Sequence, residues 1–279
     1  MRFGIKTAPQ HTTWDEMLAV WRAADEVETF ESAWNFDHFY PIVGDATGPC
    51  LEGWVTLTAL ASATQRLCVG CMVNGVPYRH PAVLANMAAS LDVVSGGRLD
   101  LGLGAGWNQL EAGAYGIELL PMRARMDRFD EAVEVIVRLL SQEVTDFDGE
   151  HFQLAEARCE PKGPQRPHPP ITIGGGGEKR TLRTAARWAQ HWNLPFATPE
   201  IFRHKRGVLL EHCAAVGRDP GEITCSVQIA VPADQPPEEV AASAAALADA
   251  GVDKVILTLR TPYRASIVER LGKALAELS

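Results

Sequence analysis

Hydrophobic and polar positions follow two alternating rhythms along this chain. Short apolar runs, typical of buried strands, are followed by longer segments with apolar residues three and four positions apart, which is the spacing of an amphipathic helix. This order predicts parallel strands joined by crossover helices. Eight strands are predicted, at residues 3–7, 32–37, 66–73, 98–103, 171–173, 191–195, 223–231 and 254–259.

A helix is predicted after each strand. The first begins near Thr13, which can act as its N-cap with Glu16 three residues later. Residues 111–120 are predicted to form an irregular connection, and the proline-rich stretch within residues 141–170 predicts a surface insertion loop before the fifth strand. The other helices are predicted at about residues 53–64, 81–95, 123–140, 179–189, 200–216, 238–250 and 264–278.

Eight strand–helix units favour a closed (β/α)8 TIM barrel, an α/β fold, over an open doubly wound sheet. The length of 279 residues fits one such domain spanning residues 1–279. A dinucleotide-binding Rossmann fold would need a GxGxxG motif after the first strand, and Gly4 has no such partners. Polar residues alternate with apolar ones in residues 98–103 and 223–231, which predicts a partly polar interior, roomy enough at the strands' carboxyl ends for a large cofactor.

Charge and cysteine content narrow the class of protein. A formal net charge of −9 and the lack of a Lys/Arg cluster argue against nucleic acid as a partner. The first residues run straight into a strand-like segment, and no apolar run approaches a membrane span, so a cytoplasmic protein is expected. The CxxC pair Cys68 and Cys71 lies in a predicted strand, where its sulfurs diverge. With no HxxxH or HExxH spacing either, no metal site is predicted.

Active sites of such barrels lie at the carboxyl ends of the strands, and four segments there carry candidate chemistry. Asp37 and His38 end the second strand, where the carboxylate could orient the imidazole for proton transfer. Residues 73–77 end the third strand in a turn that could approach a flat ring. The glycines of residues 101–106 end the fourth strand and could let a ligand come close, with Trp107 as a wall.

A glycine tract after the fifth strand is the strongest local motif. Gly174, Gly175, Gly176 and Gly177 stand between a predicted strand and a predicted helix start. Free backbone amides and the positive end of the helix dipole make such a turn a natural phosphate site. Lys179 or Arg180 could add positive charge.

Together these segments resemble the bacterial luciferase-like monooxygenase superfamily, and more narrowly its branch of oxidoreductases that use the deazaflavin coenzyme F420. The resemblance spans most of the chain, in the family's order. It is carried by Phe36-Asp37-His38 and by residues 78–85, 91–98, 101–107 and 174–177.

The resemblance implies a barrel with an insertion, often a homodimer, acting on a small-molecule substrate. It implies Asp37 and His38 as the catalytic pair beside the deazaflavin. Cofactor contacts are implied for Asp37, for a bulge at Cys71, Met72, Val73 and Asn74 with a cis peptide at Met72–Val73, for Ala105, Gly106, Trp107 and Asn108, and for Gly174 to Gly177.

One position departs from the pattern. In related sugar-phosphate dehydrogenases a glutamate implicated as the catalytic acid falls where Trp107 stands, and Glu111 nearby is assigned no role. The sequence therefore predicts hydride transfer between F420 and a small organic substrate other than a sugar phosphate. An FMN-dependent monooxygenase using reduced flavin and oxygen, and a barrel that binds a cofactor without catalysis, are the alternatives.

Overall fold

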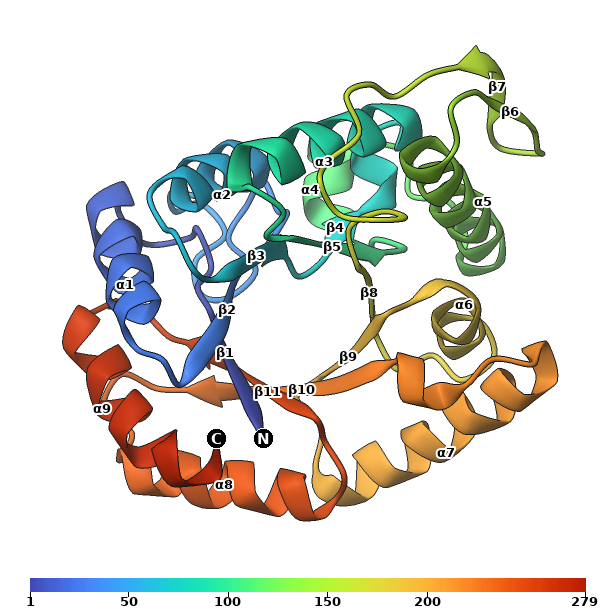
Figure 1. Ribbon diagram of the computed structural model, residues 1–279. Coiled ribbons are helices and arrows are strands. Elements are labelled where there is room, and N and C mark those ends of the chain that lie inside the picture. Colours follow the sequence, from blue (N-terminus) through green and yellow to red (C-terminus); the bar gives the residue numbers. More distant parts are fainter.

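The computed structural model describes residues 1–279, and its parallel strands form a closed ring surrounded by helices (Figure 1). The ring consists of β1 (Arg2–Lys6), β2 (Phe30–Asn35), β3 (Cys68–Cys71), β4 (Asn74–Gly75), β5 (Leu99–Gly104), β8 (Ile171–Gly174), β9 (His191–Pro195), β10 (Thr224–Val231) and β11 (Lys254–Leu259). The strand order is β3-β2-β1-β11-β10-β9-β8-β5-β4, and an additional β3–β5 pairing closes the ring. Since β3 and β4 occupy one strand position, the predicted (β/α)8 barrel is confirmed.

The helices cover the outside of the ring (Figure 1). The capping box predicted at Thr13 is present, with both of its hydrogen bonds to Glu16. No helix is long and apolar enough to span a bilayer. The helices are α1 (Trp14–Glu26), α2 (Gly53–Ser62), α3 (Pro81–Ser95), α4 (Gln109–Ala114), α5 (Met122–Ser141), α6 (Thr181–Trp188), α7 (Pro199–Val216), α8 (Pro237–Asp249) and α9 (Ala265–Leu275), with 3-10 turns η1 (Val76–Tyr78), η2 (Pro220–Glu222) and η3 (Ala276–Leu278).

Two predicted connections are wrong in detail. The insertion is not a plain loop, because β6 (Thr145–Asp148) and β7 (Gln153–Ala157) pair as an antiparallel hairpin that projects beyond α5 (Figure 1). Its return segment is tied down where the Gln165 side chain donates to the buried Asp92 carboxylate at 2.7 Å. The connection predicted as irregular begins with the short helix α4, which its Asn108 N-cap starts.

The barrel has an apolar outside layer and a partly polar inside. A cluster of 62 buried hydrophobic residues packs strands against helices. Inside the ring, Gln228 donates to Asn193 Oδ1 at 2.6 Å, and Asn193 donates to Ser226 Oγ at 2.8 Å. Ser226 continues the chain of hydrogen bonds to His191 Nε2 at 2.6 Å. The polar interior expected from the alternation in β10 is therefore present.

Candidate functional site

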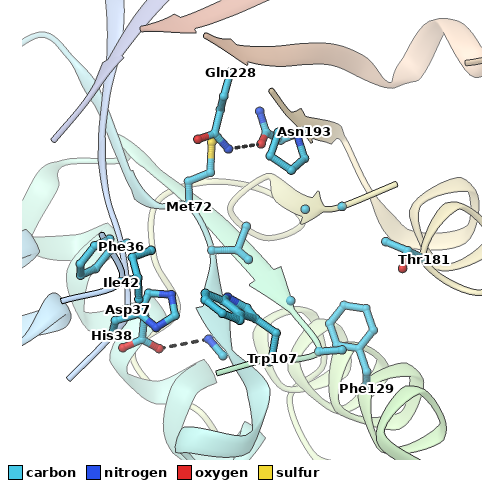
Figure 2. A pocket seen from close by; sticks show the side chains of 18 of the residues that line it. Phe36, Asp37, His38, Ile42, Met72, Trp107, Phe129, Thr181, Asn193 and Gln228 are labelled. Atoms are coloured by element: carbon cyan, nitrogen blue, oxygen red, sulfur yellow. Dashed lines mark hydrogen bonds between the residues drawn. The ribbon is translucent and has the colours of Figure 1, made fainter. Parts of the chain in front are cut away.

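A cavity of about 370 Å³ opens among the carboxyl ends of the strands (Figure 2). Nine of the predicted site residues line it: Asp37, His38, Met72, Val73, Ala105, Gly106, Trp107, Gly174 and Gly175. The β2 and β8 ends therefore meet at one cavity, as the barrel rule requires. Five predicted residues do not line it: Cys71, Asn74, Asn108, Gly176 and Gly177.

A bulge interrupts the third strand position at the cavity wall. Val69 pairs with Leu99, but Asn74 pairs with Leu103, so the register slips by one residue between them. A β-bulge has this signature of one extra residue. The Met72–Val73 peptide inside it is cis, as predicted from the resemblance.

The β5 glycines make room for this bulge. A Cβ on Gly102 would lie 2.0 Å from the Cys71 carbonyl oxygen, and one on Gly104 would lie 2.5 Å from a Val73 methyl. A Cβ on Gly174 would lie 2.8 Å from the other Val73 methyl. The expectation that residues 101–106 bring a ligand close is corrected for Gly102, which admits the bulge and does not line the cavity, whereas Gly104 contacts Val73 and also lines the cavity.

His38 is held by a carboxylate that the sequence did not assign. Its Nδ1–H donates to Glu111 Oε1 at 2.5 Å, and Glu111 is completely buried. The backbone N–H of Phe39 donates to Glu111 Oε2 at 2.8 Å, and the Tyr78 hydroxyl donates to Oε1. Burial alone would raise the pKa of Glu111, but these donors outweigh it and lower the pKa. Because the ionised Glu111 fixes the Nδ1 proton, Nε2 is left for the cavity.

Asp37 has a different partner from the predicted one. Its carboxylate accepts two hydrogen bonds from Arg79, at 2.6 and 2.8 Å, and a third from the Gly75 backbone at 3.1 Å. Consecutive residues of an extended segment point to opposite sides, so Asp37 and His38 diverge. The expectation that Asp37 orients His38 is therefore wrong. Burial raises the pKa of the Asp37 carboxyl, and the ion pair with Arg79 offsets part of that penalty.

Aromatic rings enclose the imidazole. The centroid of Trp107 lies 5.6 Å from that of His38, and the Phe36 centroid lies 5.0 Å from it, both edge-on. Trp107 is 61% exposed and stands beside His38 at the mouth, so it walls the cavity as predicted (Figure 2). Burial, together with the hydrogen bond to Glu111, raises the pKa of Tyr78 and keeps its hydroxyl protonated.

The glycine tract leaves the cavity and leads towards the start of α6. The backbone amides of Gly176 and Gly177 donate to no group of the chain, which fits an anion cradle. Of the two cations predicted to add charge here, Arg180 is engaged with Asp127 and Asp130 at 2.6 and 2.7 Å, whereas Lys179 is exposed and forms no ion pair. Helix α6 begins at Thr181, two residues later than predicted.

The remaining residues that were expected to contact the cofactor lie behind the cavity wall. The Asn74 side chain is fully buried, accepts from Trp54 Nε1 at 2.6 Å and donates to the Gly102 carbonyl at 2.7 Å. Cys71 is buried and unpaired, while Cys68 is exposed, so their sulfurs diverge as expected. With Asn108 capping α4, these side chains support the cavity and do not line it.

Several cavity residues escaped the sequence reasoning. Lys6 at the end of β1 has a usable signal, because a lysine beside the apolar residues of a strand in a closed barrel points to the cavity. Gln228 is one of the alternating polar positions of β10, whereas Asn193 of β9 carries no such signal, and Figure 2 shows both across the cavity from His38. The α5 residues that reach the cavity carried no signal, since they lie among the apolar positions of that helix: Met122, Met126 and Phe129.

Comparison with known proteins places this architecture in a family. An uncharacterised protein of Mycobacterium bovis is 32% identical over 187 residues, covering 64% of this chain and 64% of that protein. The F420-dependent glucose-6-phosphate dehydrogenase of Microbacterium testaceum is 30% identical over 207 residues, covering 74% of this chain and 60% of that enzyme. The chain thus spans less than two thirds of the length of either relative.

The structural comparison agrees on the fold. A solved F420-dependent secondary alcohol dehydrogenase in complex with an F420–acetone adduct has a TM-score of 0.89 and 18% identity, covering 100% of this chain and 99% of that one. The family model described as luciferase-like monooxygenase matches residues 1–276. The chain therefore belongs to the luciferase-like monooxygenase family.

Proposed function

We propose that this protein is an oxidoreductase that transfers a hydride between coenzyme F420 and a small organic substrate. The observation that carries the proposal is the arrangement of His38. One ring nitrogen is fixed by the buried Glu111, and the ring lines a cavity that also holds the Met72–Val73 bulge and the start of the glycine tract. The F420-dependent names of the dehydrogenase relatives support the choice of cofactor.

The residues present fit such a group. The bulge at Met72 and Val73 offers a firm, largely apolar wall for a planar ring, and Ala105 to Trp107 form a neighbouring wall. The free amides of Gly176 and Gly177 would receive the phosphate. A cavity of about 370 Å³ is within the range of small-molecule sites.

The deazaflavin, when bound, supplies the two-electron hydride chemistry. His38 handles the proton that accompanies it. With Glu111 ionised and accepting from Nδ1–H, a neutral His38 presents the Nε2 lone pair to the cavity, and a protonated one presents an N–H. His38 can therefore accept a proton from an alcohol or donate one to a carbonyl oxygen. Trp107 and Phe36 limit the access of water to that nitrogen.

The substrate is proposed to be apolar in most of its surface. Ile42, Met122 and Phe196 line the cavity, and Met122 and Phe196 are 65% and 55% exposed. Lys6 is the only lysine or arginine that lines the cavity, so the cavity offers no cluster of cations for a phosphate group of a substrate. A sugar phosphate is therefore a poor fit. Glu111 cannot take the place of the acid missing at Trp107, because it is buried and fully engaged.

Titration of the apoprotein with F420 and with FMN, followed by fluorescence, tests the proposal. We expect micromolar F420 binding that is weakened at least tenfold by Gly175→Leu. The Gly175 backbone has a φ of +117°, where a side chain is strained. Thermal melting of this variant checks that it remains folded.

His38→Ala separates a catalyst from a carrier. We expect F420 binding to stay within about twofold and hydride transfer to fall by about 10² to 10⁴. Tight FMN binding with oxygen consumption would instead identify a flavin monooxygenase. Unchanged turnover in His38→Ala would reject the assigned role.

We further propose a homodimer formed through α2 and α3. Their outer face forms a groove of about 540 Å³ lined mainly by apolar side chains, with Val55 73% and Val94 56% exposed. Helix α2 carries no charged residue, and the single charge of α3, Asp92, is buried against the insertion. Self-association about a twofold axis would cover this face. Sedimentation should give a dimer, and Val55→Glu should give a monomer; a monomeric parent protein would refute the proposal.

The six cysteines are all unpaired, which supports a reducing compartment such as the cytoplasm.

A further inference from the structure

Lys6 is the only lysine or arginine that lines the active-site cavity. The one carboxylate that lines it, Asp37, is already paired with Arg79. The positive charge of Lys6 is therefore not balanced by any acidic group of the chain within the cavity. The negative charge that balances Lys6 therefore has to come from a molecule bound in the cavity.

The ammonium group has spare donors. Lys6 Nζ donates one hydrogen bond, to Gln228 Oε1 at 3.0 Å, and an ammonium has three N–H groups. Gln228 is itself fixed, because it donates to Asn193 at 2.6 Å and accepts from the Thr258 hydroxyl at 3.2 Å. The polar network thus orients Lys6 and leaves two of its N–H groups without an acceptor in the chain.

The strand register places Lys6 two strands away from the bulge. Lys6 pairs with Trp34 of β2, and Trp34 pairs with Gly70 of β3. The bulge residue Met72 comes two positions later along the chain, roughly 7 Å further at strand spacing. Lys6 and Met72 both line the cavity, so the ammonium and the wall proposed to receive the planar ring face the same bound molecule.

The surroundings make a bound anion favourable. Burial lowers the pKa of Lys6 to about 8, an effect that Cys71 of β3 partly opposes and that Arg260, after β11, reinforces. The group is thus mostly charged at neutral pH, and it is only partly exposed. A negative ligand atom would restore the interaction that the ammonium has lost with water.

We propose that Lys6 is the anion-binding residue of the cavity, where its ammonium receives a negatively charged oxygen or nitrogen of the bound molecules. This inference rests on the proposed function for its two possible sources of charge. One is the pyrimidine end of the deazaflavin ring, which carries negative charge after reduction until it is protonated. The other is a carboxylate or enolate oxygen of the substrate. In either case Lys6 selects for a charged state that the apolar walls would reject.

The test compares the wild type with Lys6→Met and Lys6→Arg in equilibrium binding. Oxidised and anaerobically reduced F420 are titrated into each protein. Benzoate and its neutral analogue benzamide are titrated into the apoprotein and the F420-loaded protein. Because a charge-assisted hydrogen bond is lost with the ammonium, we expect the affinity for the charged ligand to fall about 10- to 100-fold.

If the deazaflavin ring is the source of the negative charge, Lys6→Met weakens the binding of reduced F420 by that factor. The affinity for oxidised F420 then stays within about twofold of the wild type. If the substrate is the source, both forms of F420 bind normally, and benzoate loses its advantage over benzamide in the loaded protein. Lys6→Arg keeps the positive charge, so in either case it retains most of the affinity that Lys6→Met loses.

The inference is overturned if Lys6→Met binds reduced F420, oxidised F420, benzoate and benzamide as the wild type does, with an unchanged melting curve. Failure of the proposed function has a different signature: F420 would not bind the wild type at all. The comparison of benzoate with benzamide in the apoprotein would still test Lys6.

Discussion

Two buried carboxylates flank the mouth of the barrel, and they have different roles. Asp37 and Glu111 are 1% and 0% exposed. Asp37 accepts from the guanidinium of Arg79 and the backbone of Gly75, so it ties the end of β2 to the segment after the bulge. Glu111 accepts from His38, Tyr78 and the backbone of Phe39. Of the two, Glu111 is the one that holds an imidazole of the cavity wall, a group that can exchange a proton with a ligand.

The comparison shows that burial alone does not identify a functional acid. Burial raises the pKa of Asp37, and its strongest partner is a permanent cation that never titrates near neutral pH. The pKa of Glu111 is lowered because its donors overcome burial, and one of those donors is an imidazole. We infer that Asp37 supports the frame of the site, while Glu111 acts through His38 as a positioning residue.

Asp37→Asn should have the largest effect, and that effect should be on stability. The amide cannot form the charged bidentate pair, so Arg79 keeps only Glu52, which is 38% exposed, as an ionic partner. Breaking a buried ion pair by removing one partner costs about 3–5 kcal/mol. Urea unfolding at pH 7 measures this loss as a lower midpoint with an unchanged m value.

The matched control is Arg79→Met combined with Asp37→Asn, which removes both charges. It should recover most of the lost stability, since the desolvation cost disappears together with the pair. An Asp37→Asn protein that unfolds like the wild type, yet fails in single-turnover hydride transfer with F420 bound, would give Asp37 a chemical role and erase the contrast with Glu111.

Most of the fold is predictable from the sequence, because the apolar runs of the strands and the helical spacing of apolar residues are both clear. All eight strand positions are predictable, since a closed parallel barrel makes every strand apolar on its outer side. The β6–β7 hairpin is not predictable, because its residues are mostly polar: residues 145–148 are TDFD and residues 153–157 are QLAEA. Helix α4 gives no periodic signal, because it has only six residues and includes Gly113.

The site was only half predictable, for a geometric reason. The barrel rule places His38, the end of the third strand and the glycine tract at one end of the barrel without knowledge of side-chain direction, and the resemblance adds the bulge. The partner of His38 depends on that direction. Asp37 is adjacent in sequence and therefore points away, whereas Glu111 lies 73 residues later and arrives through the β5–α4 connection. The same alternation rule separates Cys68 from Cys71 and applies equally to Asp37 and His38.

Glu111→Gln should have a smaller effect on stability and a clear one on catalysis. The amide still fills the space and can accept a hydrogen bond from Nδ1–H, but its charge is gone. We expect a loss of about 1–2 kcal/mol of stability at pH 7 and a fall of about 10- to 100-fold in kcat. F420 affinity should stay within about twofold, because Glu111 does not line the cavity.

The pH dependence separates this positioning role from a general loss of packing. Folding lowers the pKa of Glu111 below its ordinary value of 4.5, so its charge stabilises the fold above about pH 4.5, and that contribution is lost as the pH falls through the lower folded value. The stability difference between wild type and Glu111→Gln should therefore shrink towards zero in acid, measured by urea unfolding between pH 7 and pH 3. A difference that persists unchanged to pH 3 would mean that the substitution disturbs packing, and Glu111 would then be no more than a second structural acid like Asp37.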